Sequence, residues 1–397
     1  MSKLRVGILF GGRSGEHEVS LLSAASVLNA IDKTKYDVVP IGITKQGQWL
    51  TSAHAERLLK GNKEDTSQLR AGDPEATPGA ALLASGEGVI VPPVPSEASM
   101  VPFAQENPAK TRSGDGSLSP LHVDVIFPVL HGTFGEDGTI QGLLELADIP
   151  YVGAGVLGSA AGMDKDAMKK MFAAHGLPMV KHVTILRSQW ERDAKQTKKL
   201  IESKLKYPLF VKPANLGSSV GISKAHDSKE LGPAIEMAGG YDRKIVIEQG
   251  VGGKKGKARE IEVSVLGNDE PEASVAGEIV PSAEFYDYAA KYLDEGSELL
   301  IPAKLSKAKM KEVQQMAIAA FKAVDCAGLA RVDFLMNPKT EKLYINEINT
   351  MPGFTAISMY PKLWAASGLE YPKLITRLIE LALERNAEKK RNSYSRE

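Results

Sequence analysis

The stretch that decides the fold is residues 331–349, RVDFLMNPKTEKLYINEIN, which predicts two strands joined by an Asn-Pro-Lys-Thr turn. Side chains alternate between the faces of a strand, so Arg331 shares one face of the first strand with Asp333. By the same alternation, Glu347 and Asn349 share one face of the second strand. In the simplest register Asp333 lies opposite Glu347, and such opposed like charges destabilise a sheet unless a positive charge lies between them. Two carboxylates and an amide oxygen suit hard cations such as Mg²⁺, so the hairpin predicts a cation site.

The opposite face of this hairpin is apolar. The residues expected to point into a core are Val332, Phe334, Tyr344 and Ile348. An edge hairpin whose Asp, Glu and Asn side chains are simply solvated has the same pattern. The hairpin alone therefore leaves both interpretations open.

The composition is that of a soluble protein with several domains. At 397 residues, the chain is too long for one ordinary core, and its length predicts two or three domains. Lys plus Arg and Asp plus Glu number 49 each, so no global basic field attracts nucleic acid or an anionic membrane. An anionic ligand must therefore be held by local groups.

Two features bear on the compartment. Cys326 is the only cysteine, which rules out an internal disulfide framework, and its context favours a buried filler over a catalytic nucleophile. The first apolar run, at residues 6–10, has the length of a strand, and no apolar span is long enough to cross a bilayer. We therefore expect a cytoplasmic protein.

Hydrophobic periodicity predicts an α/β chain of three domains, at residues 1–154, 155–249 and 250–386, followed by a charged, frayed tail at 387–397. In the first domain, strands alternate with helices, which predicts a doubly wound parallel sheet. Its first helix has Leu21, Ala25, Leu28 and Ile31 at helical spacing. Residues 72–120 are crowded with Pro, Gly, Ser and Ala, and we expect a flexible insertion there.

The second and third domains are expected to mix helices and strands. The expected helices are residues 165–174, 307–324 and 371–385, and the expected strands are 179–184, 209–212, 245–248, 260–266 and 273–279, besides the hairpin. A long polar connection at 281–302 lies before the second of these helices.

Two glycine-rich loops follow strands of the first domain. The first, residues 11–16 (GGRSGE), places Glu16 at a helix start, where its carboxylate either holds an ammonium group or interacts with the helix dipole. The second, residues 131–138 (HGTFGEDG), follows an apolar run, and open α/β sheets bind ligands at such strand ends. A plain turn accounts for its glycines but not for His131, so a site is favoured.

Two further segments indicate a nucleotide and a lid. Lys212 ends a strand shortly before residues 217–221 (GSSVG), whose small residues and hydroxyls offer donors to phosphate; a serine-rich turn is the alternative. Residues 285–292 (FYDYAAKY) place many aromatic side chains in a long connection. A lid that closes over a ligand accounts for them, as does simple packing against the body.

Taken together, these motifs resemble the D-alanine:D-alanine ligase family, and their order and spacing agree over nearly the whole chain. The stretches that carry the resemblance are residues 11–20, 131–138, 163–165, 211–221, 286–292, 331–333 and 346–355. The resemblance implies the ATP-grasp architecture: an N-terminal parallel sheet, a small central α+β lid domain, and a C-terminal α+β domain with an antiparallel sheet. It implies ATP-dependent joining of two D-alanines through an acyl phosphate, for peptidoglycan precursors.

The resemblance also implies roles for individual residues toward ATP and metal. ATP phosphates are assigned to Lys165, Lys212 and Ser219, the transferred phosphoryl group to Lys291, and adenine and ribose to Glu248, Val251 and Glu260. Two Mg²⁺ ions, for which Mn²⁺ substitutes, are assigned to Asp333, Glu347 and Asn349, with Glu347 bridging both.

Substrate roles follow from the same resemblance. The first D-alanine is assigned to Glu16, linked to Ser218 and Tyr292, and to His131 nearby; the second is assigned to Ser358 and Met359. Arg331 and the Gly353 backbone would polarise the carboxylate under attack. The family implies a homodimer. A ligase that uses D-lactate or D-serine as second substrate and a nucleotide-binding regulator without catalysis remain alternatives.

Overall fold

The computed structural model describes residues 3–51, 87–95, 100–102, 121–252, 257–280 and 298–394. The chain forms two compact units. Unit 1 consists of Met1–Val156, Gly353–Pro361 and Leu369–Glu397, and unit 2 consists of Leu157–Pro352 and Lys362–Gly368. The expected division into three domains, with boundaries at residues 154 and 249, stays a prediction.

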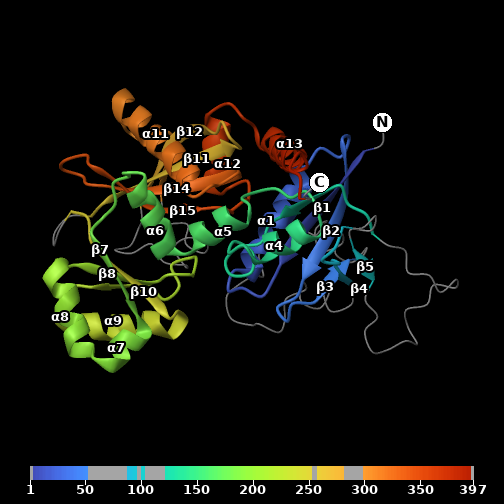
Figure 1. Ribbon diagram of the computed structural model, residues 1–397. Helices are drawn as coiled ribbons and strands as arrows, with labels where there is room; N and C mark the ends of the chain where they lie inside the picture. The colour runs from blue at the N-terminus through green and yellow to red at the C-terminus, as the bar shows by residue number, and fades with distance from the viewer. Residues whose placement is uncertain are drawn as a thin grey trace. The chain divides into compact units, whose positions relative to one another are not determined.

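Unit 1 is built on a mixed six-stranded sheet with the order β5-β4-β3-β2-β1-β6 (Figure 1). The parallel strands are β1 (Leu4–Gly11), β2 (Tyr36–Ile43) and β6 (Val125–Pro128). The antiparallel edge is formed by β3 (Trp49–Thr51), β4 (Glu87–Ile90) and β5 (Val101–Pro102). The last six residues of β1 are buried because a central parallel strand is covered on both faces. The α/β class and the parallel centre of the sheet are confirmed.

The antiparallel edge concerns the predicted insertion. Strands β4 and β5 fall inside residues 72–120, so part of this segment pairs with the sheet. Most of the segment lies outside the described residues, and its predicted flexibility stays a prediction.

Helix α1 (His17–Ala30) packs against β1 through a face that its apolar residues do not reveal. Leu21 and Leu28, which have helical spacing, are only partly buried, whereas Ser20 and Ser23 are fully buried. Ser20 Oγ accepts a hydrogen bond from the Gly11 amide at 2.8 Å and donates one to the Val129 carbonyl. A hydrogen-bonded hydroxyl can be buried at little cost in free energy. These two polar residues of α1 therefore lie on its buried face, which the hydrophobic periodicity does not predict.

Unit 2 contains a four-stranded antiparallel sheet with the order β7-β10-β8-β9. Its strands are β7 (His182–Leu186), β8 (Leu209–Pro213), β9 (Ser223–Ala225) and β10 (Lys244–Gln249). The helices α7 (Arg187–Arg192), α8 (Ala194–Lys204) and α9 (Ser228–Tyr241) lie on one side of this sheet (Figure 1). The core between them is aliphatic, with Ile201, Leu231 and Ile245 fully buried.

The second sheet of unit 2 has five antiparallel strands in the order β13-β12-β11-β14-β15. These are β11 (Arg259–Gly267), β12 (Glu272–Val280), β13 (Glu298–Leu300), β14 (Gly328–Met336) and β15 (Leu343–Asn349), and α11 (Lys307–Ala323) packs on them. The remaining helices of the described chain are α4 (Thr139–Leu146), α5 (Val156–Met163), α6 (Lys165–Ala174), α12 (Met359–Ala366) and α13 (Tyr371–Lys389). The expected helix at residues 165–174 matches α6.

The hairpin β14–β15 contains a β-bulge that the sequence does not signal. Asp333 pairs with Glu347 as expected, but the next pair is Phe334 with Ile345, so β15 carries Asn346 as an extra residue. The bulge reverses the alternation beyond this point. Ile345 is therefore fully buried, whereas Tyr344 is only partly buried, under the Lys342 ammonium. The prediction that Tyr344 points into the core is wrong.

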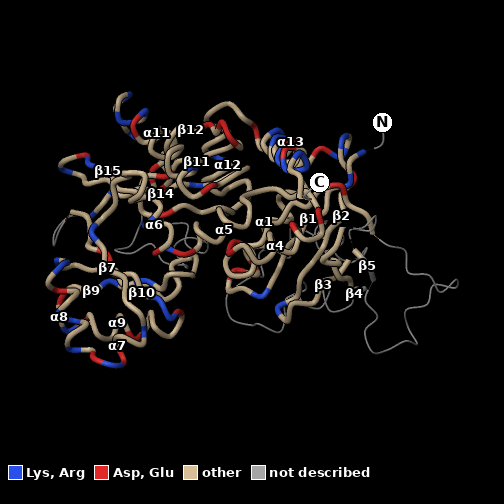
Figure 2. The backbone as a smooth tube through the Cα atoms, viewed as in Figure 1, with Lys and Arg blue, Asp and Glu red and all other residues tan. Residues whose placement is uncertain are grey.

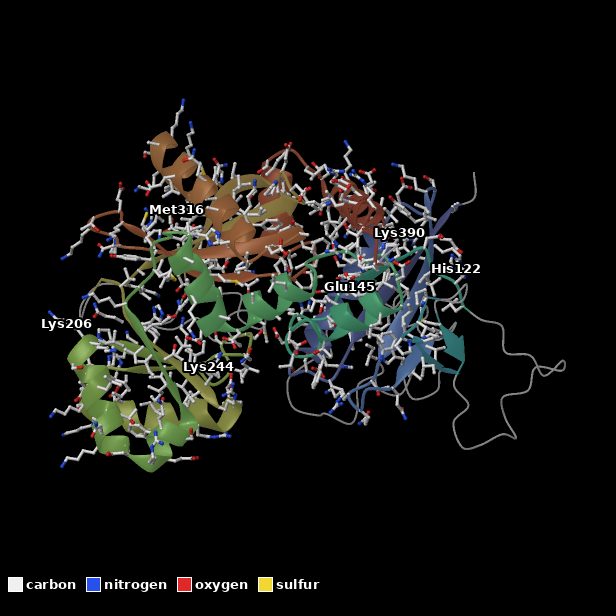
Figure 3. The ribbon with its side chains drawn as sticks, in the orientation of Figure 1. His122, Glu145, Lys206, Lys244, Met316 and Lys390 are labelled. Carbon is white, nitrogen blue, oxygen red and sulfur yellow. The ribbon has the colours of Figure 1, made fainter. Side chains whose placement is uncertain are left out.

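Helix α13 runs to Lys389 and so takes in the first three residues of the segment expected to be frayed. Its C-terminal part contacts α4 and the residues that follow it, within unit 1: Lys389 pairs with Glu145, and Lys390 lies 3.7 Å from Asp148. Figure 3 labels Glu145 and Lys390, which mark the two sides of this contact. The Arg385 guanidinium stacks 4.4 Å from the Tyr151 ring centroid.

Charged side chains of both signs are spread over outer helices such as α8 and α13 (Figure 2). This mixture agrees with the formal net charge of zero. Among the described residues, we find no helix with the length and apolar character needed to span a membrane.

Candidate active site

Arg331 lies between the carboxylate of Asp333 on the hairpin and that of Glu262 on the neighbouring strand. Its Nε and Nη2 each donate to an Asp333 oxygen at 2.7 Å, and Nε lies 3.0 Å from Glu262 on β11. Asn349 Nδ2 donates to Asp333 at 2.9 Å. The positive charge that the opposed Asp333 and Glu347 require is therefore supplied at least in part by the chain itself.

The donor chemistry of this hairpin face fits a hard cation. Asp333, Glu347 and Asn349 offer two carboxylates and one amide oxygen, and Mg²⁺ takes only one or two carboxylates while keeping several waters. In the part of the chain that the structure describes, no group of three or more His, Cys, Asp and Glu side chains is arranged to hold a metal. The metal assignment stays a prediction.

A buried charge cluster adjoins the hairpin. Glu248, which is 2% exposed, lies 2.7 Å from both Lys169 Nζ and Lys212 Nζ. Burial by itself disfavours the Glu248 carboxylate, but the two ammonium charges outweigh it and hold the pKa of Glu248 well below its usual range. Although burial opposes the charge on Lys212, Glu248 raises the pKa of Lys212. Glu248 and Lys212 are therefore both charged near neutral pH.

Lys169 was missed by the sequence reasoning. It follows Lys165 by four residues on α6, so the two lysines share a helix face, and this spacing is the signal that could have revealed it. Lys169 is 1% exposed, which is exceptional for a lysine. Its ammonium reaches both Glu248 and, at 3.5 Å, the Asn346 carbonyl.

Lys165 joins the same cluster from the start of α6. Its Nζ donates to the Leu216 carbonyl at 2.7 Å and lies 3.9 Å from a Glu347 oxygen. Its backbone amide donates to the Ala214 carbonyl at 3.0 Å. Lys165 therefore ties the loop after β8 to the acidic hairpin face.

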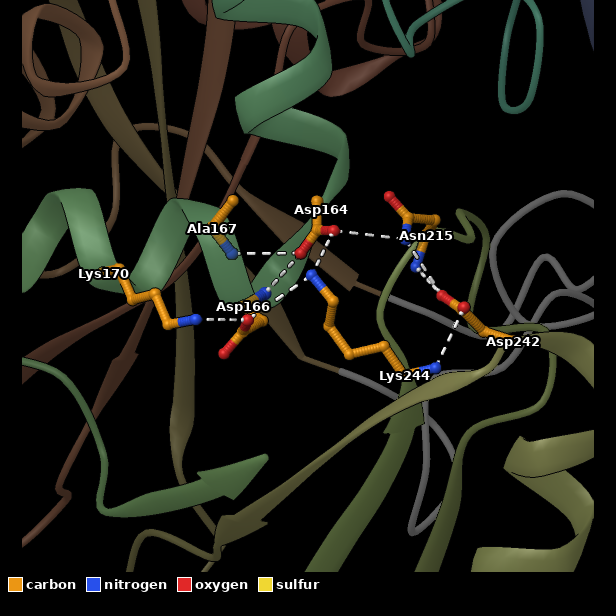
Figure 4. A network of polar contacts seen from close by, with 7 residues as sticks. All are labelled: Asp164, Asp166, Ala167, Lys170, Asn215, Asp242 and Lys244. Carbon is orange, nitrogen blue, oxygen red and sulfur yellow. Dashed lines mark hydrogen bonds and ion pairs between the residues drawn. The ribbon is translucent and has the colours of Figure 1, made fainter. Parts of the chain in front are cut away.

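A second network fixes the start of α6 (Figure 4). Lys244 Nζ lies 2.7 Å from Asp164 and 3.4 Å from Asp166. Asp164 also caps α6 by accepting from the amides of Asp166 and Ala167, each at 3.0 Å. Asn215, in the loop after β8, donates to Asp164 at 3.3 Å and to Asp242 at 3.0 Å. The network holds the helix start, the loop and the first residue of β10 together.

The loop after β8 has an unusual backbone. Ser218 and Ser219 have φ values of 49° and 59°, which side-chain-bearing residues rarely adopt. Gly221 has a φ of 70°, and a Cβ there would lie 2.5 Å from the Tyr241 ring. Strained backbone of this kind gathers at ligand sites, where successive amides can face an anion.

Polar side chains of unit 1 lie around His131, and of these only Glu16 was predicted as a substrate residue. Ser23 Oγ lies 3.0 Å from His131 Nε2, and Glu136 lies 3.7 Å from Nδ1. Glu16 packs closely on Gly132, the residue after His131: a Cβ on Gly132 would lie 2.6 Å from the Glu16 carboxylate. Burial, opposed by the hydrogen bond from His131, raises the pKa of Glu136 to about 7. Two carboxylates and an imidazole thus gather in unit 1, and the carboxyl of Glu136 titrates near neutral pH.

A pocket of about 280 Å³ opens beside this group, with Gly12, Arg13 and His131 in its lining. It lies at the carboxyl ends of the parallel strands β1 and β6, because Gly12 follows β1 and His131 follows β6. Open α/β sheets bind ligands at this edge.

Residues 353–358 form the second predicted substrate segment of unit 1. Ser358 Oγ lies 2.7 Å from Thr355 Oγ1 and accepts from the Thr355 amide at 3.1 Å. A Cβ on Gly353 would lie 3.2 Å from the same Ser358 oxygen. Met359 follows as the first residue of α12 and is buried. The segment is therefore a tight turn centred on the Ser358 hydroxyl.

The structure gathers the predicted residues into two groups. The predicted residues Lys165, Lys212, Glu248, Arg331, Asp333, Glu347 and Asn349 lie together in unit 2, whereas Glu16, His131, Gly353, Ser358 and Met359 belong to unit 1. Val251 lies in the turn after β10, and Glu260 lies on β11. The predicted lid, including Lys291 and Tyr292, lies outside the described residues.

Comparison with known proteins agrees with this arrangement. Residues 5–154 match the family described as D-ala D-ala ligase N-terminus, and residues 171–380 match D-ala D-ala ligase C-terminus. A D-alanine–D-alanine ligase from Natranaerobius thermophilus is 49% identical over 397 residues, covering 99% of this chain and 98% of its own length. One from Thermoanaerobacter sp. is 50% identical over 393 residues, covering 98% and 99%.

Two solved structures are also similar. The D-alanine-D-alanine ligase of Coxiella burnetii has a TM-score of 0.78 at 36% identity and covers 98% of this chain and 97% of its own. The VanG D-Ala:D-Ser ligase of Enterococcus faecalis has a TM-score of 0.79 at 34% identity and covers 96% and 100%. The fold is that of the ATP-grasp ligases. Within that class, the chain belongs to the D-alanine–D-alanine ligase family.

Proposed function

We propose that this protein joins two D-alanine molecules into D-alanyl-D-alanine, converting ATP to ADP and phosphate, for peptidoglycan synthesis. The relatives that match it along its full length are named as D-alanine–D-alanine ligases. The observation that carries the proposal is the cluster in which Lys165, Lys212 and Glu347 meet beside Asp333. Two cations next to two acidic side chains suit a phosphate chain and its counter-ion.

In the first step, a carboxylate oxygen of the donor D-alanine attacks the γ-phosphorus of ATP. The new bond joins this oxygen to phosphorus, the bond to the β-phosphate oxygen breaks, and ADP leaves. Lys165 and Lys212 hold the phosphates, and Glu16 accepts hydrogen bonds from the donor's ammonium group. Asp333, Glu347 and Asn349 would hold Mg²⁺, which would supply positive charge against the phosphates.

In the second step, the amine of the acceptor D-alanine attacks the acyl phosphate, loses a proton, and expels phosphate. Arg331, whose guanidinium plane is fixed by Asp333, and the Gly353 amide stabilise the oxyanion that forms on the donor carbonyl. Ser358 receives the acceptor's carboxylate. Lys291 and Tyr292 are proposed to close over the acyl phosphate and exclude water.

The identity of the acceptor is the finer part of the proposal. The VanG protein of similar fold is named as a D-Ala:D-Ser ligase, so a hydroxylated acceptor is a specific alternative. Mass spectrometry of products formed from D-alanine mixed with D-serine or D-lactate distinguishes them. We expect the alanyl-alanine product to dominate at neutral pH.

We also propose two Mg²⁺ ions, replaceable by Mn²⁺, and a homodimer. Light scattering of the purified protein tests the second proposal, since a monomeric mass at micromolar concentration contradicts it.

The decisive experiment measures phosphate release from ATP. We expect release to require both D-alanine and Mg²⁺, and Glu347→Gln to abolish it by weakening metal affinity. Glu341→Gln is the matched control, because Glu341 is an exposed residue of the same hairpin turn. ATP turnover that is indifferent to D-alanine contradicts the proposed function, as does a full rate for Glu347→Gln at low Mg²⁺. A regulator without catalysis would bind ATP and release no phosphate.

A further inference from the structure

The acceptor segment belongs to a different unit from the hairpin that precedes it. Strand β15 ends at Asn349 in unit 2, whereas Gly353–Pro361 belongs to unit 1. The residues proposed to bind the acceptor therefore share a unit with Glu16 and His131, which are proposed to bind the donor. Contacts within unit 1 show how the segment is held.

An aromatic cluster around Phe354 holds the acceptor segment, residues 353–358, in place. Phe354 is fully buried, and its ring centroid lies 5.6 Å from those of Phe127 and Tyr371 and 5.7 Å from that of Tyr360. Tyr371, the first residue of α13, also donates its hydroxyl to the Phe354 carbonyl at 2.6 Å. Aromatic packing of this kind fixes a ring, and the hydroxyl additionally fixes the orientation of the peptide.

A second anchor comes from helix α1. Ser26 Oγ accepts a hydrogen bond from the Ala356 amide at 3.0 Å, and the Ser26 side chain also hydrogen-bonds Tyr371. Three residues earlier on the same helix, Ser23 contacts His131. Helix α1 therefore touches the proposed donor residues and the acceptor segment at once.

We propose that Tyr371 and Ser26 are positioning residues of the acceptor subsite. They fix the peptides on either side of Thr355, so that the Gly353 amide and the Ser358 hydroxyl keep one geometry relative to Glu16 and His131. This inference rests on the proposed function, because the acceptor role of Ser358 is itself proposed. Neither residue touches substrate, and both act through the backbone of residues 354–356.

The test uses Tyr371→Phe and Ser26→Ala in the full-length protein. D-alanine dependence of phosphate release yields separate Michaelis constants for donor and acceptor. We expect each variant to raise the acceptor KM about fivefold, as one lost hydrogen bond implies, and to leave the donor and ATP constants within twofold. Ser26→Thr, which keeps the hydroxyl, restores the acceptor KM.

The matched control is Tyr36→Phe. Tyr36 is a buried tyrosine of β2 whose hydroxyl bonds Thr376, which lies further along α13 than Tyr371. We expect it to leave all three Michaelis constants unchanged. A donor KM that rises as much as the acceptor KM overturns the inference, and so does an unchanged acceptor KM in both test variants.

Hydrogen exchange supplies a readout that needs no turnover. The Ala356 amide should exchange faster in Ser26→Ala and in Tyr371→Phe than in wild type or Tyr36→Phe, because its acceptor is lost or displaced. Unchanged exchange overturns the inference even if the enzyme is active. A wild-type protein that forms no dipeptide overturns the proposed function instead, and the exchange rates still decide whether these two residues hold the segment.

Discussion

The side-chain oxygen of Asn346 accepts a hydrogen bond from Lys212 Nζ at 3.1 Å, joining the two sheets of unit 2. Asn346 is the extra residue of the bulge in β15. A regular strand would place it in the alternation of its neighbours, whereas the bulge turns it toward the lysine cluster. One inserted residue therefore links the acidic hairpin to the proposed phosphate site.

Asn346→Ala should weaken ATP binding. Lys212 loses an acceptor that orients its ammonium, so we expect the KM for ATP to rise about threefold to tenfold with little change in either D-alanine constant. Steady-state kinetics check this, with Asn392→Ala as the control because Asn392 is exposed beyond α13. An altered D-alanine constant with a normal ATP constant would contradict the role assigned to Asn346.

Glu248→Gln should destabilise the protein strongly. The change leaves Lys169 and Lys212 buried without their shared carboxylate, and breaking such an arrangement costs about 3 kcal/mol or more. Urea unfolding at pH 7 measures the loss, and adding Lys169→Met to Glu248→Gln should recover part of it.

The same carboxylate gives a pH test. Since the folded-state pKa of Glu248 is lowered, its stabilisation is present above the ordinary glutamate pKa of about 4.3 and is lost as pH falls toward the folded pKa. Acidification below that range should therefore narrow the difference between wild type and Glu248→Gln. A gap that stays constant down to pH 3 would argue against the charge pair as its source.

Lys244→Met should impair nucleotide use at a distance. Asp164 and Asp166 lose their shared cation, which loosens the start of α6 and with it Lys165 (Figure 4). We expect kcat/KM for ATP to fall about tenfold, while Lys206→Met, an exposed lysine of the same unit labelled in Figure 3, leaves it unchanged. Equal losses in both variants would point to a general effect of removing a charge.

Donor binding should depend on pH through Glu136, whose pKa is raised to about 7. As pH rises through 7, the new carboxylate charge near Glu16 should favour the donor's ammonium, so kcat/KM for the first D-alanine increases. Glu136→Gln should remove this step and hold the value low, whereas Glu18→Gln, a partly exposed change on α1, keeps it. A step that persists in Glu136→Gln would assign it to another group.

The free energy of unfolding is expected to change with pH in the opposite direction: the charge on Glu136 that should favour donor binding disfavours the folded state. Because the folded-state pKa of Glu136 lies above its ordinary value, its contribution is full below the unfolded pKa and is lost as pH rises through about 7. Thermal unfolding between pH 5 and 8 should therefore show a smaller loss for Glu136→Gln than for wild type. Identical pH dependence would contradict the burial of this carboxyl.

The long periodic elements could be predicted from the sequence because their patterns span many residues. The α/β class, the helix at residues 165–174 and the pairing of Asp333 with Glu347 are confirmed. The orientation of Tyr344 was mispredicted because a strict alternation was extended from Ile348 back to Tyr344, across the bulge at Asn346. The buried face of α1 was hidden because Ser20 and Ser23 hydrogen-bond Val129 and His131, which lie far along the chain.

Site residues could be predicted from the sequence only where they belong to a recognisable local motif. The acidic hairpin and Lys212 were found from sequence. Lys169 is marked only by its four-residue spacing from Lys165, and Lys244 acts through tertiary contacts that no local pattern encodes. Roles assigned by resemblance, including those of Lys291 and Tyr292, stay predictions. Tertiary pairing of charges is the information that sequence reasoning lacked.

Unit 1 combines the first strand and the last helix of the described chain, which affects how it can fold during synthesis. This unit takes its first strand from residues 4–11 and its last helix from residues 371–389. The apolar face of α13, which includes Leu374, Ile375 and Leu378, is fully buried in the folded protein, and the helix packs against β6 and α1. During synthesis, the strands of unit 1 leave the ribosome long before α13 does. The surface that α13 covers therefore stays exposed until residues 371–389 have been made. A polypeptide that ends before Tyr371 leaves that surface open to chaperones and to aggregation.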